Sequence, residues 1–240
     1  SVSLGNSVIV NPSGQVVARA PEMKPAIIYA NIEVNMAKAQ SSPALRGQTG
    51  KLLGDWNKMA VEELLAQEKG EESSATPKQA NDSIIRLALM QTVPEKWNLD
   101  KNFDTFIKLL DQAGNADIFI TPECWLDGYA AADKTSTPEK LRAIAQNIQT
   151  SKYIGRVAEE ARKRQMYICF GFTSIENGQV FNSAGLWDKT GKLVGIFHKT
   201  HLQTHDLQFA RGEGLPVWDT PWGKVRSEER RVGKECRSRW

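Results

Sequence analysis

Two ionisable residues stand at the ends of strand-like runs, where they could share a reaction site. Glu123 follows the run 117–121 and a proline, and Lys199 ends the run 193–199. Active sites of α/β proteins gather at the carboxyl ends of strands. A carboxylate there could transfer a proton, and a fixed ammonium could stabilise an oxyanion. Taken singly, each residue is more simply a solvated carboxylate or a surface lysine, because both types are mostly exposed.

The three cysteines are weaker candidates for a nucleophile. Cys124 adjoins Glu123, but neighbours in an extended segment point to opposite sides, so we expect it to face the core. Cys169 lies inside an apolar run and is most simply a packing residue. Cys236 lies among basic residues that would lower its pKa, but no fold signal surrounds it. Without CxxC spacing, the set favours a reducing compartment, with the cytoplasm as the default.

Three histidines near Lys199 raise the alternative of a metal site. His198, His201 and His205 are spaced by three and four residues after a strand, without the glutamate of an HExxH motif. We therefore expect no metal there. No glycine-rich loop of either nucleotide-binding type is present, so no nucleotide cofactor is indicated.

Composition points to an ordinary globular protein. The chain has 240 residues, 40% hydrophobic and 25% charged, which is enough for one domain with a sizeable core. Its formal charge of +3 arises wholly from residues 226–240, which hold six Arg or Lys and three Glu. The other 225 residues have a net charge of zero and lack the basic character that is typical of nucleic-acid-binding proteins. Apolar runs fall far short of the roughly 20 residues of a membrane span, and no signal peptide is visible.

The elements around these residues predict an α/β layered fold. Near the N-terminus, the runs 8–10 and 15–18 flank Asn-Pro-Ser-Gly and predict a hairpin, and 27–34 predicts a further strand. Residues 59–67 have helical spacing and lead into a polar linker, 68–83. Beyond it, strands alternate with helices. The expected strands are 84–91, 117–121, 166–173, 180–187 and 193–199, and the expected helical segments are 99–113 and 140–165.

Several motifs in this part occur in the order of one family. Residues 84–225 resemble the opening half of the nitrilase, or carbon–nitrogen hydrolase, family. The motifs are residues 86–91, Pro122-Glu123 with Gly128-Tyr129, Phe181-Asn182-Ser183, residues 195–202 and residues 209–225. Residues 4–46 resemble its closing part. The order is thus inverted, which leaves open a cut through tandem domains or a joined or permuted gene fragment.

The resemblance implies a fold and a chemistry. The fold is the αββα sandwich, here incomplete, with 1–67 as a C-terminal part, 68–83 as linker and 84–225 as an N-terminal part. The activity is hydrolysis of a non-peptide carbon–nitrogen bond, in an amide or carbamoyl compound rather than a nitrile, without cofactor or metal. Intact members are expected to be homo-oligomers. A cysteine attacks, Glu123 is the general acid/base, Lys199 stabilises the tetrahedral intermediate, and Asp206 is a candidate second acid.

The family nucleophile has no match in this chain. The pattern would place a cysteine near position 230, which is Arg230. Residues 226–240 instead resemble translated vector or adaptor sequence, so Cys236 is not carried over. We expect the chain to be inactive. Two alternatives stay open: a non-catalytic ligand-binding or assembly module of the same fold, and a gene fragment without function.

Two contacts test this interpretation. Residues 5–34 should pack on the sheet formed by 84–91 and 117–121, because neither piece alone covers its apolar strand faces. The side chains of Glu123 and Lys199 should converge on one cavity.

Overall fold

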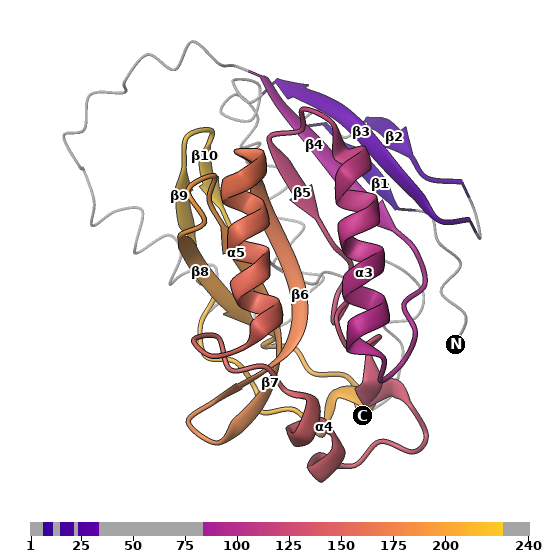
Figure 1. The fold of residues 1–240 in the computed structure, drawn as a ribbon. Helices are drawn as coiled ribbons and strands as arrows, with labels where there is room; N and C mark the ends of the chain where they lie inside the picture. The colour runs from indigo at the N-terminus through magenta and orange to yellow at the C-terminus, as the bar shows by residue number, and fades with distance from the viewer. Residues whose placement is uncertain (1–6, 12–14, 22–23, 34–83, 228–240) are drawn as a thin grey trace, which may run out of the picture.

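A mixed six-stranded sheet organises the molecule (Figure 1). The computed structural model describes residues 7–11, 15–21, 24–33 and 84–227. The central strands β4, β5 and β6 are parallel, and the outer pairs are antiparallel. In spatial order the strands are β3 (Ala26–Glu33), β4 (Ile84–Gln91), β5 (Ile118–Ile120), β6 (Tyr167–Glu176), β7 (Gln179–Trp187) and β8 (Leu193–His198).

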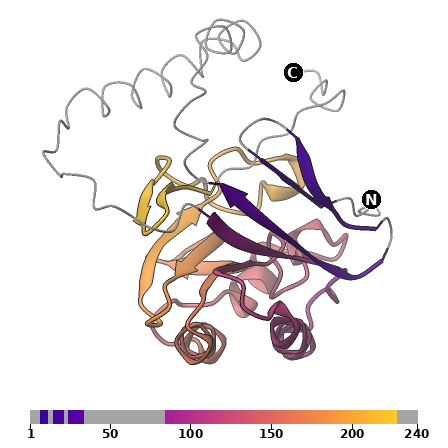
Figure 2. The ribbon, with the colours of Figure 1, turned by 90° about the horizontal axis from the view of Figure 1, so that it is seen from above.

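Two amphipathic helices cover one face of this sheet, seen end-on in Figure 2. They are α3 (Leu99–Leu110), continued by the 3-10 turn Asp111–Ala113, and α5 (Lys152–Arg164). The side chains of Asn98 and Ser151 cap their N-termini by accepting backbone N–H bonds. The helices bury apolar stripes against the aromatic side chains of the sheet. No described helix has the length and apolar character that a membrane crossing requires.

Two hairpins lie on the opposite face. The first, β1 (Val8–Val10) with β2 (Val16–Arg19), packs Ile9 onto Ile28 of β3 and the neighbouring part of β4. The second, β9 (Trp218–Thr220) with β10 (Gly223–Val225), places the Trp222 ring 4.9 Å from that of Tyr167. The described residues therefore form a helix layer, a sheet and a partial covering layer, which is an incomplete α/β sandwich.

The N-terminal piece and the later part share one sheet, as predicted. All eight residues of β3 pair with β4, from Ala26 opposite Gln91 to Glu33 opposite Ile84. The piece does more than supply a covering layer, since β3 extends the sheet itself while β1–β2 covers it. Figure 1 shows this indigo-to-purple segment beside β4.

Most predicted elements are confirmed within a few residues. The helical segments predicted over 140–165 are two helices: α4 (Pro138–Ile144), after which Gln146 pairs with Ser174 of β6, and α5, which begins at Lys152. Strands β9 and β10 were not predicted. The hairpin turn at 12–14, the helical run 59–67 and the linker 68–83 lie outside the described residues.

We predict that the two pieces unfold together. Ile28 is 8% exposed and packs between the hairpin and β4. Replacing it with Ala should lower the free energy of unfolding by about 2 to 5 kcal/mol through lost burial and a cavity. Urea unfolding followed by tryptophan fluorescence would measure this, since the tryptophans of the described part all lie beyond residue 90. Val10→Ala, at a 46% exposed position, is the control; an Ile28→Ala protein with an unchanged midpoint would contradict the shared core.

Candidate functional site

Glu123 is carried by a turn that leaves the end of β5. Thr121 Oγ1 accepts the backbone N–H of Gly171 on β6 at 2.9 Å, which ties the turn to the sheet. A Cβ atom at Gly171 would lie 2.4 Å from the carbonyl oxygen of Pro122, so only glycine allows this approach. The Glu123 side chain is 37% exposed and lines the cavity on the sheet face opposite α3 and α5.

Lys199 follows β8 and is almost fully buried, at 3% exposure. Its Nζ donates to Glu123 Oε1 at 2.9 Å and to Asp206 Oδ2 at 2.7 Å. The predicted convergence of Glu123 and Lys199 is therefore confirmed, and Asp206 joins them. Asp206 lies in the 3-10 turn Thr204–Asp206 (η4), where its Oδ2 also accepts the backbone N–H of Gln203 at 3.1 Å.

Tyr129 connects the two carboxylates. Its hydroxyl donates to Asp206 Oδ1 at 2.7 Å, lies 3.2 Å from Glu123 Oε1 and receives a bond from Lys199 Nζ at 3.3 Å. His205 Nε2 lies 3.0 Å from the same hydroxyl. Tyr129 has φ 54°, a left-handed conformation that is uncommon for a residue with a side chain. The network outweighs this local cost, which is typically about 1 to 3 kcal/mol.

Asn182 adds a neutral donor from the middle of β7. Its Nδ2 donates to Glu123 Oε1 at 2.6 Å, and its backbone carbonyl accepts the N–H of Lys199 at 2.8 Å. The side chain is buried, at 4% exposure. Asn182 therefore contacts the Glu123 carboxylate with its side chain and the Lys199 backbone with its own backbone.

The site carries two acids and one ammonium in a largely dry setting. Burial raises the pKa of Asp206, but hydrogen bonds from Lys199, Tyr129 and the Gln203 backbone outweigh it, so the pKa lies below its usual value. Burial, together with the nearby charges of Glu123 and Asp206, raises the pKa of Tyr129, which stays a neutral hydroxyl.

A cavity of about 220 Å³ opens beside this cluster. One end is polar, with Glu123, Lys199 and Asn182, and the rest is lined mainly by Ile120, Ala184 and Phe197. The space suits a small ligand with a polar head and a short apolar portion.

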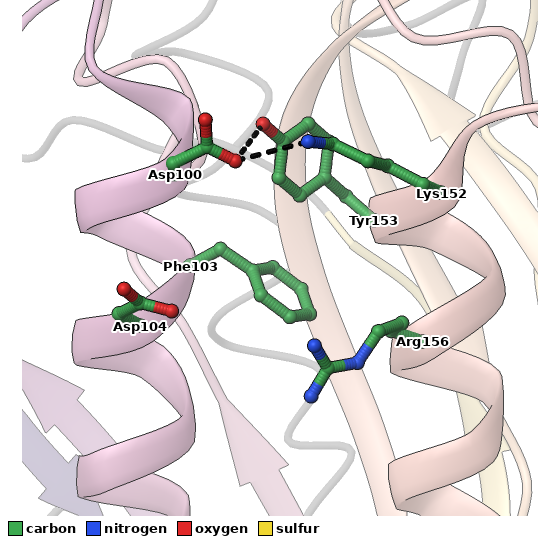
Figure 3. A pocket seen from close by; sticks show the side chains of 6 residues that line it. All are labelled: Asp100, Phe103, Asp104, Lys152, Tyr153 and Arg156. Carbon is green, nitrogen blue, oxygen red and sulfur yellow. Dashed lines mark hydrogen bonds and ion pairs between the residues drawn. The ribbon is translucent and has the colours of Figure 1, made fainter.

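A smaller hollow of about 100 Å³ lies on the helix layer instead, between α3 and α5 (Figure 3). Asp100 there accepts hydrogen bonds from Lys152 and Tyr153, and the Arg156 guanidinium lies over the Phe103 ring, 5.4 Å from its centroid. The hydrogen bonds to Asp100 are solvent-exposed, Phe103 belongs to the core, and the hollow lies across the sheet from Glu123 and Lys199.

The two described cysteines occupy different surroundings. Cys124 is fully buried among Ala130, Leu141 and Phe209, so the prediction that it faces the core is confirmed. The reason given was wrong, because residues 123–128 form a turn, with Cys124 at φ 44°, and not an extended segment. Burial, with the charges of Asp127 and Glu123, raises the pKa of Cys124 well above its usual value.

Cys169 on β6 is partly buried and lines the cavity wall. Burial raises its pKa to about 11, so the thiol is protonated at neutral pH. Cys236 and Arg230 lie outside the described residues.

The three histidines do not converge. The ring of His198 lies on the helix side, with Nδ1 2.8 Å from Ser183 Oγ and Nε2 3.1 Å from Glu176. His201 contacts the neighbouring Thr200 hydroxyl, and His205 contacts Tyr129. Within residues 84–227 and the described N-terminal segments, no cluster of three or more metal-ligating side chains occurs.

Sequence reasoning did not single out Tyr129, Asn182 or Asp127 as site residues. Asp127 is 1% exposed and fixes the turn by accepting backbone N–H bonds from Ala130 at 2.9 Å and Thr173 at 3.1 Å. Two signals were available: Tyr129 and Asn182 lie within the motifs Gly128-Tyr129 and Phe181-Asn182-Ser183, and an amide inside a strand requires hydrogen-bond partners when it is buried.

We predict that Lys199 stabilises the fold as well as the site. Lys199→Met should lower the free energy of unfolding by about 3 to 5 kcal/mol, because it leaves the buried Asp206 carboxylate without its cation. The double variant Lys199→Met/Asp206→Leu should regain much of that loss, since no charge is then stranded. Chemical denaturation would measure both, with the exposed Lys192→Met as control. Equal stability of the two variants would contradict a buried ion pair.

A second prediction concerns how the free energy of unfolding changes at low pH. The pKa of Asp206 is lower in the folded than in the unfolded protein, so its carboxylate stabilises the fold above the unfolded value of about 3.9. That stabilisation is lost as the pH falls through the pKa that Asp206 has in the folded protein. The difference in unfolding free energy between the wild type and Asp206→Asn should therefore be widest near neutrality and shrink on acidification. A difference independent of pH would contradict the assignment.

Comparison with known proteins identifies the family of this chain. The family model of carbon–nitrogen hydrolases matches residues 86–235, well over half of the chain. The match continues beyond residue 225, so the boundary placed there stays a prediction. The Nesterenkonia sp. amidase structure gives a TM-score of 0.49 at 22% identity, covering 59% of this chain and 54% of that one.

Curated relatives each match about three fifths of the chain. A nitrilase from Pseudomonas syringae pv. syringae is 24% identical over 152 residues, covering 58% of this chain and 45% of the nitrilase. A Pyrococcus abyssi nitrilase is 27% identical over 146 residues, covering 59% and 54% respectively. The chain thus spans about half the length of these relatives. With the family model matched over most of the chain, this protein belongs to the carbon–nitrogen hydrolase family.

Proposed function

We propose that this chain carries the acid/base and oxyanion-stabilising part of a carbon–nitrogen hydrolase site for small amides or carbamoyl compounds, without a nucleophile of its own. The observation that supports it best is the contact of Lys199 Nζ with both Glu123 and Asp206 beside a cavity. The proposal places the chain in the cytoplasm, in keeping with its few cysteines.

Each side chain then has a distinct task. Glu123 takes a proton from the attacking group and returns it to the leaving nitrogen. The Lys199 ammonium faces the oxygen that becomes negative when the carbonyl carbon turns tetrahedral. Asp206 keeps Lys199 charged and in place, because an opposite charge favours the ionised form.

The described thiols are poorly suited to the nucleophile's task. Cys124 is enclosed by apolar side chains and has no access to the cavity. Cys169 reaches the cavity, but with its pKa at about 11 it is protonated at neutral pH. Family chemistry requires a thiolate at a fixed distance from Glu123, and Arg230 occupies the sequence position expected for it.

A binding module is the second candidate, favoured by one observation. Among the described residues, the polar cluster and the cavity are assembled without a thiol suited to attack. Such a site could bind a small amide through the N–H groups of that amide, without hydrolysing the ligand.

We predict no turnover by the chain as it stands. A panel of small amides, carbamoyl compounds and nitriles should show no hydrolysis above that of the Glu123→Gln protein. Arg230→Cys should also be inactive, because productive attack needs placement to within about half an ångström. Hydrolysis that disappears after iodoacetamide treatment would show that an existing cysteine acts as nucleophile, and would overturn this part of the proposal.

A further inference from the structure

We infer that Asn182 is a positioning residue that fixes the Glu123 carboxylate, so that Oε1 is held by the protein and Oε2 is the oxygen presented to the cavity. This inference rests on the proposed function in so far as Glu123 acts on an amide. It adds that the two oxygens of the Glu123 carboxylate, Oε1 and Oε2, have different roles.

The hydrogen bonds to Glu123 are one-sided. Oε1 receives Asn182 Nδ2 at 2.6 Å and Lys199 Nζ at 2.9 Å, and the Tyr129 hydroxyl lies 3.2 Å away. Among the described residues, no hydrogen bond to Oε2 occurs. A carboxylate oxygen accepts about two hydrogen bonds, so Oε1 is saturated while Oε2 keeps its full capacity. The carboxylate plane is therefore set by contacts to one oxygen.

Asn182 is the donor committed to Glu123. Lys199 and Tyr129 each also bind Asp206, at 2.7 Å in both cases, and these are shorter than their contacts to Glu123. Without Asn182, Glu123 would have only Lys199 and Tyr129 as donors, and it would compete with Asp206 for both. The Asn182 amide makes the shortest of the three contacts and comes from the centre of a strand paired on both sides. Its position is fixed by the sheet, since a buried strand residue has little freedom to move.

The side-chain amide of Asn182 is uncharged, which suits it to orienting Glu123. An amide N–H orients the carboxylate without placing a second positive charge beside it. The Oε2 atom of Glu123, to which no described residue donates, suits a ligand that donates N–H groups, such as a primary carboxamide.

Acetamide is the probe with which we would measure how Asn182 affects ligand binding. Titration followed by ¹⁵N–¹H spectra should give a dissociation constant that rises roughly tenfold in Asn182→Ala, the loss expected for one hydrogen bond to a charged group. Asn182→Asp should bind more weakly still, because a third carboxylate faces Glu123. Ser174→Ala is the matched control: Ser174 is buried on β6, at 2% exposure, and its hydroxyl bonds Ser183 and not Glu123. Wild-type affinity in Asn182→Ala, or an equal loss in Ser174→Ala, would overturn the inference.

A ligand-free measurement separates this inference from the proposed function. The side-chain NH₂ signals of Asn182 in the wild type should show one slowly exchanging proton, and Glu123→Gln should shift them more than any other side-chain amide. Unchanged Asn182 signals in Glu123→Gln would overturn the positioning role, whatever acetamide does. If the signals shift but wild-type protein binds no acetamide, the amide-site proposal fails and the Asn182–Glu123 contact stands.

Discussion

The buried ammonium of Lys199 is the group on which the site depends. At 3% exposure it has lost nearly all of its hydration, a cost of several kcal/mol that must be offset by carboxylates in good geometry. Glu123 and Asp206 supply them at 2.9 and 2.7 Å. Asp206 is itself buried and requires the cation in turn. The two charges therefore fix each other, and the surrounding polar groups arrange themselves around that pair.

The sheet explains how residues 76 positions apart in sequence meet. Parallel pairing of β5 with β6 sends the turn that carries Glu123 across the middle of β6, at Gly171. Antiparallel pairing of β6, β7 and β8 then returns the chain twice, bringing Asn182 and Lys199 to the same region. Because side chains alternate along a strand, Asn182 faces Glu123 while neighbouring Ser183 contacts His198 on the helix side. A one-residue shift of register would remove Asn182 from the site.

The described residues of the N-terminal piece support this sheet through backbone pairing and apolar contacts. Strand β3 pairs along all of β4, and Gln91 at the end of β4 binds the N-terminal segments through Ser7, Pro21 and Lys24. Hairpin β1–β2 covers part of the apolar face that continues, through Ile120 and Cys169, into the cavity wall. The order of the pieces along the chain is thus compatible with one shared core.

The sequence alone determined the α/β class, most strands and the helices, because periods of 2 and 3.6 are local properties of the chain. Motif order also identified Glu123, Lys199 and Asp206, as residue types suited to proton transfer and charge stabilisation. Tertiary structure decided what those residues touch. The left-handed turn at Tyr129, the two-sided role of Asn182 and the enclosure of Cys124 depend on strand register and on contacts between distant segments. No local pattern encodes such contacts, since each arises only when the sheet brings the partners together.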